Sequence, residues 1–115
     1  GFDRTPVVLV VRTFTAQWLP IAQHCTGIIV EVGAELSHAA TILRTLGRPT
    51  IIGVRSAYDA LPTGTQVTLV AGSGYVEIDQ KPALGALPDA QFTALPDFGA
   101  TQGLVLSEIT ARFRR

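Results

Sequence analysis

The sequence predicts an α/β fold in which a mixed β-sheet forms the core and a few short helices pack against it. Short apolar runs rich in β-branched residues indicate buried strands, and three of them stand at residues 7–11, 27–32 and 50–54. Between the second and the third run, apolar residues recur at the spacing of one helical face. Two further β-rich runs, at residues 67–70 and 75–78, flank a glycine-containing loop, which is typical of a β-hairpin.

The segments after the first and third strands predict short helices. Thr15 is a plausible N-cap for the first of these helices, and Pro20 fits the start of its second turn. Trp18, within this helix, is better explained as an anchor in the core or against another domain than as a platform for a ligand. Ser56 with Asp59 forms a second helix-start signal after the third strand.

The stretch from Gly33 to Gly53 predicts a glycine-led turn, a helix and a strand. Ser37 is a good N-cap, because its hydroxyl can accept a hydrogen bond from a backbone N–H that the first helical turn leaves unpaired. Gly47 suits a left-handed C-cap, and Pro49 prevents the helix from continuing. The residues on the helical face expected to be buried are Ala39, Ile42, Leu43 and Leu46.

From residue 79 the pattern changes. Scattered proline and glycine residues predict a loop or an extended cover rather than regular structure. Leu106, Ile109 and Phe113 then fall at helical spacing, which predicts a short amphipathic helix at the end of the chain. We therefore divide the chain into a domain core at residues 1–79 and a C-terminal extension at residues 80–115 that packs on the core or links from it.

His38 precedes the apolar face of its helix and lies in the predicted first turn. There the backbone N–H groups point outward and the helix dipole is positive, which disfavours the imidazolium and keeps the ring neutral and nucleophilic. The same features favour an anion such as phosphate. A nucleophile and an anion site would thus coincide, although the spacing alone is explained more simply by a histidine packed against its neighbours in the capping region.

The spaced residues around His38 resemble the signature of the phosphohistidine domain, the mobile swivelling domain of phosphoenolpyruvate-utilising enzymes. That family includes pyruvate phosphate dikinase, phosphoenolpyruvate synthase, Enzyme I of the sugar phosphotransferase system and rifampicin phosphotransferase. Its pattern runs roughly G-G-x-x-[ST]-H-x-x-x-x-A-R-x-x-G-x-P-x-[VI]-x-G, and the likeness extends from about residue 6 to residue 78. The matching residues are Gly33, Ser37, His38, Arg44, Gly47, Pro49, Ile51 and Gly53.

Several residues depart from the family pattern. Ala34 replaces the second glycine, so the turn must adjust if that position needs a positive φ. Leu36 stands where many members have threonine, which removes a hydroxyl near the histidine. Leu43 replaces a small residue and changes only the packing. Ala71 stands where many members have aspartate, so we assign it no catalytic role.

The resemblance implies a swivelling β/β/α domain that works as a phosphoryl carrier. A partner domain would place a phosphoryl group on His38, the catalytic nucleophile, and the domain would then swing to present it to a second active site. Gly33, Ser37 and Ala39 would bind the phosphoryl group at the start of the helix. Arg44 does not share a helical face with His38, and we interpret it as a structural or docking residue.

The same resemblance implies partners. The chain shows no glycine-rich nucleotide loop with an accompanying lysine and no acidic cluster for magnesium. We therefore expect no cofactor bound by this domain itself, and Mg²⁺ with ATP or phosphoenolpyruvate bound by nucleotide- and substrate-binding domains in the same or another chain. The domain would be a phosphotransferase component, of the phosphoenolpyruvate synthase or dikinase kind, that is incomplete without them. The alternatives are a docking or regulatory module, with Ala34 and Leu36 as signs of relaxed chemistry, and a small-anion binder.

Composition sets further bounds. The chain has 115 residues, enough for one domain with a core, and with 47% hydrophobic and 16% charged residues we expect part of its surface to face another domain. Nine basic and nine acidic residues cancel, which gives no support to nucleic-acid or membrane binding. The single cysteine fits a reducing compartment, and no apolar run approaches the length of a membrane span. We therefore expect a soluble cytoplasmic protein.

His24, Cys25 and Glu31 are potential metal ligands that lie near one another in the sequence. Their spacing matches no recognised zinc pattern. We interpret Cys25 as a small buried hydrophobic residue and expect no metal in this domain.

Overall fold

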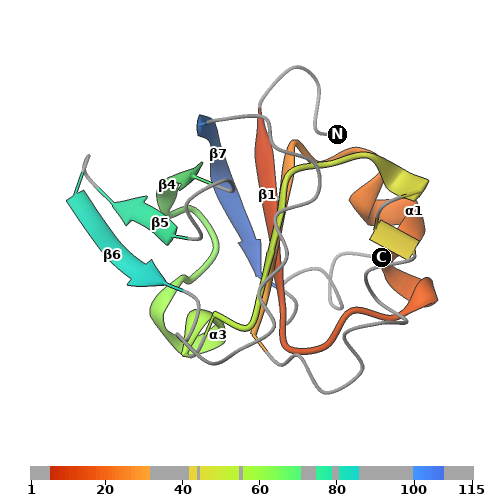
Figure 1. Ribbon diagram of the computed structural model, residues 1–115, viewed down its shortest axis with the longest axis horizontal. Coiled ribbons are helices and arrows are strands. Elements are labelled where there is room, and N and C mark those ends of the chain that lie inside the picture. The colour runs from red at the N-terminus through yellow and green to blue at the C-terminus, as the bar shows by residue number, and fades with distance from the viewer. Residues whose placement is uncertain are drawn as a thin grey trace.

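A mixed sheet organises the part of the chain that the computed structural model describes (Figure 1). Its seven strands follow the order β3-β2-β1-β7-β4-β5-β6. The described residues are 6–31, 42–43, 45–54, 56–70, 75–78, 81–85 and 100–107. The elements are β1 Val7–Val11, η1 Ala16–Trp18, α1 Leu19–Ala22, β2 Gly27–Val30, β3 Thr50–Ile52, α3 Ala57–Ala60, β4 Gln66–Val70, β5 Tyr75–Ile78, β6 Lys81–Gly85 and β7 Ala100–Ser107.

The sheet has a parallel half and an antiparallel half. β1 is parallel to β2 and to β7, and β2 is parallel to β3. β4 runs antiparallel to β7 and to β5, and β5 runs antiparallel to β6. The predicted α/β fold with a mixed sheet and short helices is therefore confirmed, as is the predicted hairpin of β4 and β5.

Helices cover both faces of the parallel half. Leu9 belongs to a buried cluster with Trp18 and Leu43, whereas its neighbour Val10 belongs to a second cluster with Leu61. Successive side chains of a strand point to opposite faces, so the two clusters lie on the two sides of β1. Figure 1 shows α1 and α3 on opposite sides of that strand. Trp18 is only 5% exposed and packs in the core, the first of the two anchor positions that were predicted for it.

The prediction for the C-terminal part was wrong where the structure describes it. Leu106 lies in β7, not in a helix, and β6 is a strand where a loop was expected. β7 lies between β1 and β4 and is hydrogen-bonded to both. This tertiary pairing overrides the local helical spacing. Pro82 argued against a strand at β6. The strand forms nevertheless because β6 lies at the edge of the sheet, where proline is tolerated. Ile109 and Phe113 lie outside the described residues.

The helix starts fall where they were expected, but without the expected caps. η1 follows Thr15 and α3 follows Ser56, yet neither side chain makes a capping hydrogen bond. The hydroxyl of Thr15 is buried and has no hydrogen-bond partner among the described residues. Ser56 has a φ of 67°, in the left-handed region, which β-carbon-bearing residues adopt at a cost. Pro20 lies at the start of α1, which follows η1 directly, so it begins the second helical turn of this segment, as predicted.

Candidate functional site

The segment that carries the candidate nucleophile begins at the carboxyl edge of the parallel strands. β1 and β2 end together, with Val11 paired to Val30. Backbone hydrogen bonds continue past these ends: the N–H of Glu31 donates to Val11 O at 3.0 Å, and the N–H of Gly53 donates to Val30 O at 2.8 Å. The carboxyl ends of parallel strands are where α/β folds commonly bind ligands. The chain enters residues 32–41 from this edge.

The predicted site residues lie outside the part of the chain that the structure describes. That holds for residues 32–41 and for residue 44. The roles assigned to these residues therefore stay predictions. They concern the nucleophile His38, the phosphate-binding residues Gly33, Ser37 and Ala39, and the docking residue Arg44. The described chain reaches Glu31 on one side of them and resumes at Ile42 on the other.

The second half of the predicted helix is described, and it matches the prediction. Residues 42–43 and 45–46 are helical. Leu43 is fully buried, and Ile42 and Leu46 pack partly buried against the same cluster. Gly47 has a φ of 72°, and its N–H donates to Leu43 O at 3.0 Å, which is the hydrogen bond of a left-handed C-cap. This packing holds the end of the helix on the sheet just before β3.

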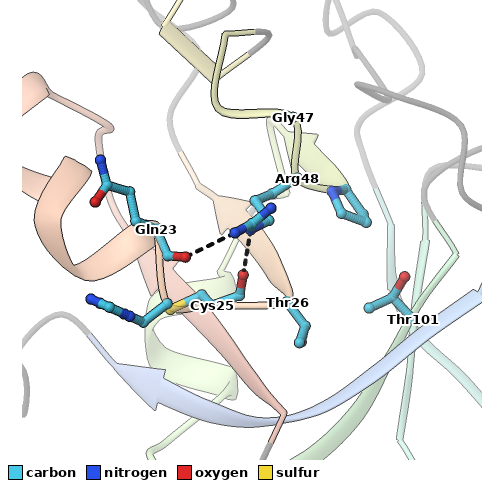
Figure 2. A pocket seen from close by; sticks show the side chains of 8 residues that line it. Gln23, Cys25, Thr26, Gly47, Arg48 and Thr101 are labelled. Carbon is cyan, nitrogen blue, oxygen red and sulfur yellow. Dashed lines mark hydrogen bonds between the residues drawn. The ribbon is translucent and has the colours of Figure 1, made fainter. Parts of the chain in front are cut away.

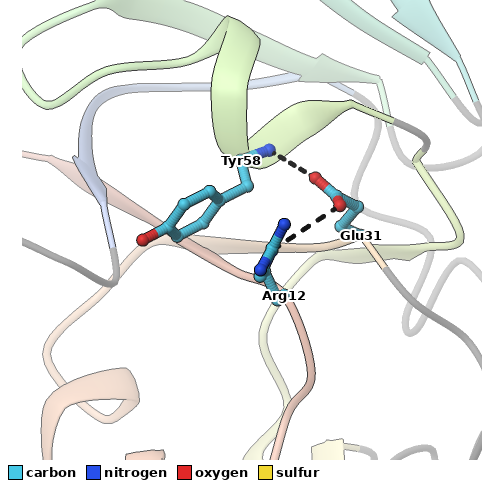
Figure 3. Close-up of polar contacts among 3 residues, drawn as sticks. All are labelled: Arg12, Glu31 and Tyr58. Carbon is cyan, nitrogen blue, oxygen red and sulfur yellow. Dashed lines mark hydrogen bonds and ion pairs between the residues drawn. The ribbon is translucent and has the colours of Figure 1, made fainter.

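A polar cluster stands at the carboxyl edge, directly beside the start of the undescribed segment (Figure 3). Oε1 of Glu31 accepts a 2.8 Å hydrogen bond from the backbone N–H of Tyr58, and Oε2 lies 4.0 Å from Nε of Arg12. The Arg12 guanidinium lies over the Tyr58 ring, 4.9 Å from its centroid, in cation–π geometry. The cluster thus joins the ends of β1 and β2 to the first turn of α3.

The members of this cluster differ in exposure. The Arg12 side chain is 59% exposed and that of Glu31 only 16%. Glu31 therefore acts as a tether between elements, whereas Arg12 presents a positive charge to solvent at the edge where phosphate binding is predicted. Sequence reasoning did not single out Arg12 or Tyr58. The signal that could have found Arg12 is a cation directly after a buried strand.

The three potential metal ligands His24, Cys25 and Glu31 do not converge. His24 and Cys25 precede β2, whereas Glu31 follows it, so the strand separates them. The described residues hold no group of three potential metal ligands. Cys25 is 2% exposed, and its Sγ lies 3.4 Å from Ile21 O, which confirms the interpretation as a small buried residue.

The thiol of Cys25 is a poor nucleophile. Burial raises its pKa from 9.0 to about 12, and the nearby positive charge of Arg48 offsets only part of that effect. Because the thiolate is the reactive form, the thiol stays protonated and inert near neutral pH.

Among the described residues, no helix has the length and apolar character needed to cross a bilayer.

A comparison with protein families gives one match, a model described as "PEP-utilising enzyme, mobile domain", which covers residues 3–74. That range includes the entire motif around His38 and every parallel strand except β7.

Relatives of known name resemble the chain over a small part of their own length. A phosphoenolpyruvate synthase from Aeropyrum pernix is 30% identical over 102 residues, which are 89% of this chain and 12% of the relative. A pyruvate kinase from Sporosarcina psychrophila is 32% identical over 66% of this chain and 13% of the relative, and a rifampicin phosphotransferase from Bacillus subtilis is 32% identical over 61% and 8%. The chain thus spans about a tenth of these relatives. No solved structure matches it significantly.

Proposed function

The chain belongs to the family of mobile domains of PEP-utilising enzymes, and we propose that it carries a phosphoryl group on His38 between two active sites. The observation that carries this proposal is the family match over residues 3–74, which contains the complete spaced motif from Gly33 to Gly53. Relatives named phosphoenolpyruvate synthase and rifampicin phosphotransferase support a phosphotransferase setting.

In the proposed reaction, a neutral imidazole nitrogen of His38 attacks the phosphorus of a donor. The N–P bond forms as the P–O bond to the donor breaks, and the N–P bond later breaks when an acceptor oxygen takes the phosphoryl group. One difficult transfer thereby becomes two easier ones. Backbone N–H groups at the start of the helix, with the hydroxyl of Ser37, would stabilise the charge of the phosphoryl group.

Hydrogen bonds among the described residues hold the end of β2 in place. Val30 O accepts hydrogen bonds from the N–H groups of Gly53 and Val54, at 2.8 and 3.1 Å. The carboxylate of Glu31 accepts a hydrogen bond from the N–H of Tyr58. The segment bearing His38 therefore starts from an anchored strand end. We propose that positioning of His38 depends on this anchor, because transfer between two sites needs a defined geometry at each.

The donor and the acceptor belong to partner domains in this proposal. The chain spans 12% of the Aeropyrum phosphoenolpyruvate synthase, so most of such an enzyme lies in other domains. Those domains would bind Mg²⁺ with ATP or phosphoenolpyruvate, and a substrate-binding domain would hold the acceptor. In the cytoplasm, where these substrates occur, the domain would alternate between the two.

Labelled phosphoenolpyruvate and labelled ATP, each incubated with the chain and the partner domains, test the carrier role. We expect acid-labile, alkali-stable label on the chain, abolished in His38→Ala and retained in His24→Ala. His24 is the matched control, because it is the chain's other histidine and is exposed just before β2, at the amino edge of the parallel strands.

The alternative is a docking or regulatory module of the same fold, which the departures Ala34 and Leu36 favour. The same experiment separates the two functions. Absence of label on the chain, with partner domains shown to react with their own substrates, would support the docking module and refute the carrier.

A further inference from the structure

A hollow of about 410 Å³ opens to solvent at the amino edge of the parallel strands (Figure 2). It lies between the end of α1, the turn from Gly47 to Pro49 and the start of β7. Thr26 directly precedes β2 and Thr101 lies near the start of β7, so the hollow is at the opposite edge from Glu31, the last described residue before the segment bearing His38. None of its described lining residues was assigned to the candidate carrier site.

Arg48 is fixed in the wall of this hollow. Its Nε donates to Cys25 O and its Nη2 to Gln23 O, both at 2.9 Å. Figure 2 shows these two bonds on one side of the guanidinium, with Thr101 across the hollow from it. Two hydrogen bonds to backbone carbonyls hold the planar group in one orientation, so a ligand would not have to order it.

The positive charge of Arg48 is not neutralised within the described part of the chain. Its two acceptors are uncharged carbonyls, and none of the described residues that line the hollow is an aspartate or a glutamate. Its remaining N–H groups make no hydrogen bond with described residues. A half-buried arginine of this kind is most stable when an oxyanion accepts those N–H groups, because a guanidinium binds carboxylate or phosphate through two parallel hydrogen bonds.

We propose that this hollow is a binding site for a small oxyanion, in which Arg48 provides the paired donors and the hydroxyl of Thr101 a further one. The ligand class is a compound with a carboxylate or a phosphate group small enough for the hollow. The site lies at the opposite edge of the sheet from Glu31, where the segment bearing His38 begins, so the proposal does not involve the nucleophile. The inference stands independently of the carrier function.

Titration of the ¹⁵N-labelled whole chain tests the proposal. Pyruvate supplies the carboxylate, inorganic phosphate supplies the phosphate, and chloride keeps the ionic strength constant. We expect saturable shifts at the Arg48 Nε–H and at the amides of Gln23, Thr26 and Thr101 with at least one of the two anions. Whichever saturates at the lower concentration identifies the preferred group.

Two variants and one control sharpen the test. Arg48→Gln should weaken binding at least about tenfold, because both charge-assisted hydrogen bonds are lost. Thr101→Val leaves the bonds of Arg48 intact and should weaken binding by a smaller factor, so it decides the matter if Arg48→Gln does not fold. Arg12→Gln removes the same charge at the opposite edge and should leave the affinity within about twofold.

Three results would overturn the proposal. The first is chemical shifts that stay linear with concentration for both anions. The second is an affinity that is unchanged in the folded Arg48→Gln and Thr101→Val variants. The third is a loss of affinity in Arg12→Gln equal to that in Arg48→Gln, which would indicate general charge attraction.

Discussion

The backbone N–H of Tyr58 donates a 2.8 Å hydrogen bond to Oε1 of Glu31, and this bond ties α3 to the residue from which the segment bearing His38 departs. The end of β2 is thereby held from two sides, by the neighbouring strands and by a helix. The carboxylate is 16% exposed, so water competes poorly for either partner.

Glu31→Ala should lower the free energy of unfolding by about 1–3 kcal/mol, because the N–H of Tyr58 loses its acceptor. Glu31→Gln keeps an amide oxygen at that place and should lose much less. Urea denaturation measures both. Arg12→Gln is the control and should cost less than about 1 kcal/mol, since that side chain is 59% exposed and 4.0 Å from the carboxylate. Equal losses in Glu31→Gln and Glu31→Ala would show that the charge, not the hydrogen bond, matters.

Gly103→Ala should destabilise the sheet by about 1–3 kcal/mol through overpacking. A Cβ at residue 103 would lie 2.8 Å from Cγ2 of Val8 and 3.3 Å from the backbone of Pro6. Val8→Ala removes the closer obstacle, so the double variant should lose less than the sum of the two single losses. Thermal unfolding of the four proteins measures this coupling. Strict additivity would contradict the proposed clash.

Ser56→Gly should stabilise the chain by up to about 1 kcal/mol, because glycine adopts the φ of 67° without steric cost. The exposed Ser56 side chain makes no capping hydrogen bond, so nothing is lost with it. Ala60→Gly, at an exposed position of the same helix, is the control and should destabilise by about 0.5–1 kcal/mol. Denaturant unfolding that ranked Ser56→Gly below the unmodified chain would show that the serine relieves the strain by other means.

Cys25 should make the chain less stable in alkali. Its pKa is about 12 in the folded chain and 9.0 as the reference for the unfolded one. The folded state therefore holds the proton more tightly, and the stabilisation is complete below pH 9.0 and falls as the pH rises toward 12. Cys25→Ala lacks this contribution, so its free energy of unfolding should decline less steeply above pH 9.0. Parallel slopes for the two proteins would contradict the assigned pKa.

Local patterns predicted the elements whose structure is set locally. The apolar run of β1, the hairpin of β4 and β5, and the left-handed Gly47 all follow from short-range chemistry. The local sequence did not predict β7, because its strand structure comes from pairing with β1 and β4, which are distant in sequence. The bonds of Arg48 to Gln23 and Cys25 span 25 and 23 residues and leave no local signal either.

For the candidate site, the sequence supplied the motif and the described structure supplies its surroundings. The motif around His38 identified the family, which the match over residues 3–74 supports. The described flanks add what no motif contains: the segment starts at the carboxyl edge beside Glu31, and the helix after it is packed through Leu43. These contacts join residues far apart in the chain, so they depend on the completed fold.

The most direct test of the central claim is to locate the phosphoryl group on the chain. After reaction with active partner domains and their phosphoryl donor, fragmentation mass spectrometry under neutral conditions should find one added phosphoryl group, on His38. The His38→Asn variant should gain none, and His24→Asn should be modified as fully as the unmodified chain. A phosphoryl group on any other residue, or none while the partner domains are demonstrably active, would contradict the carrier function.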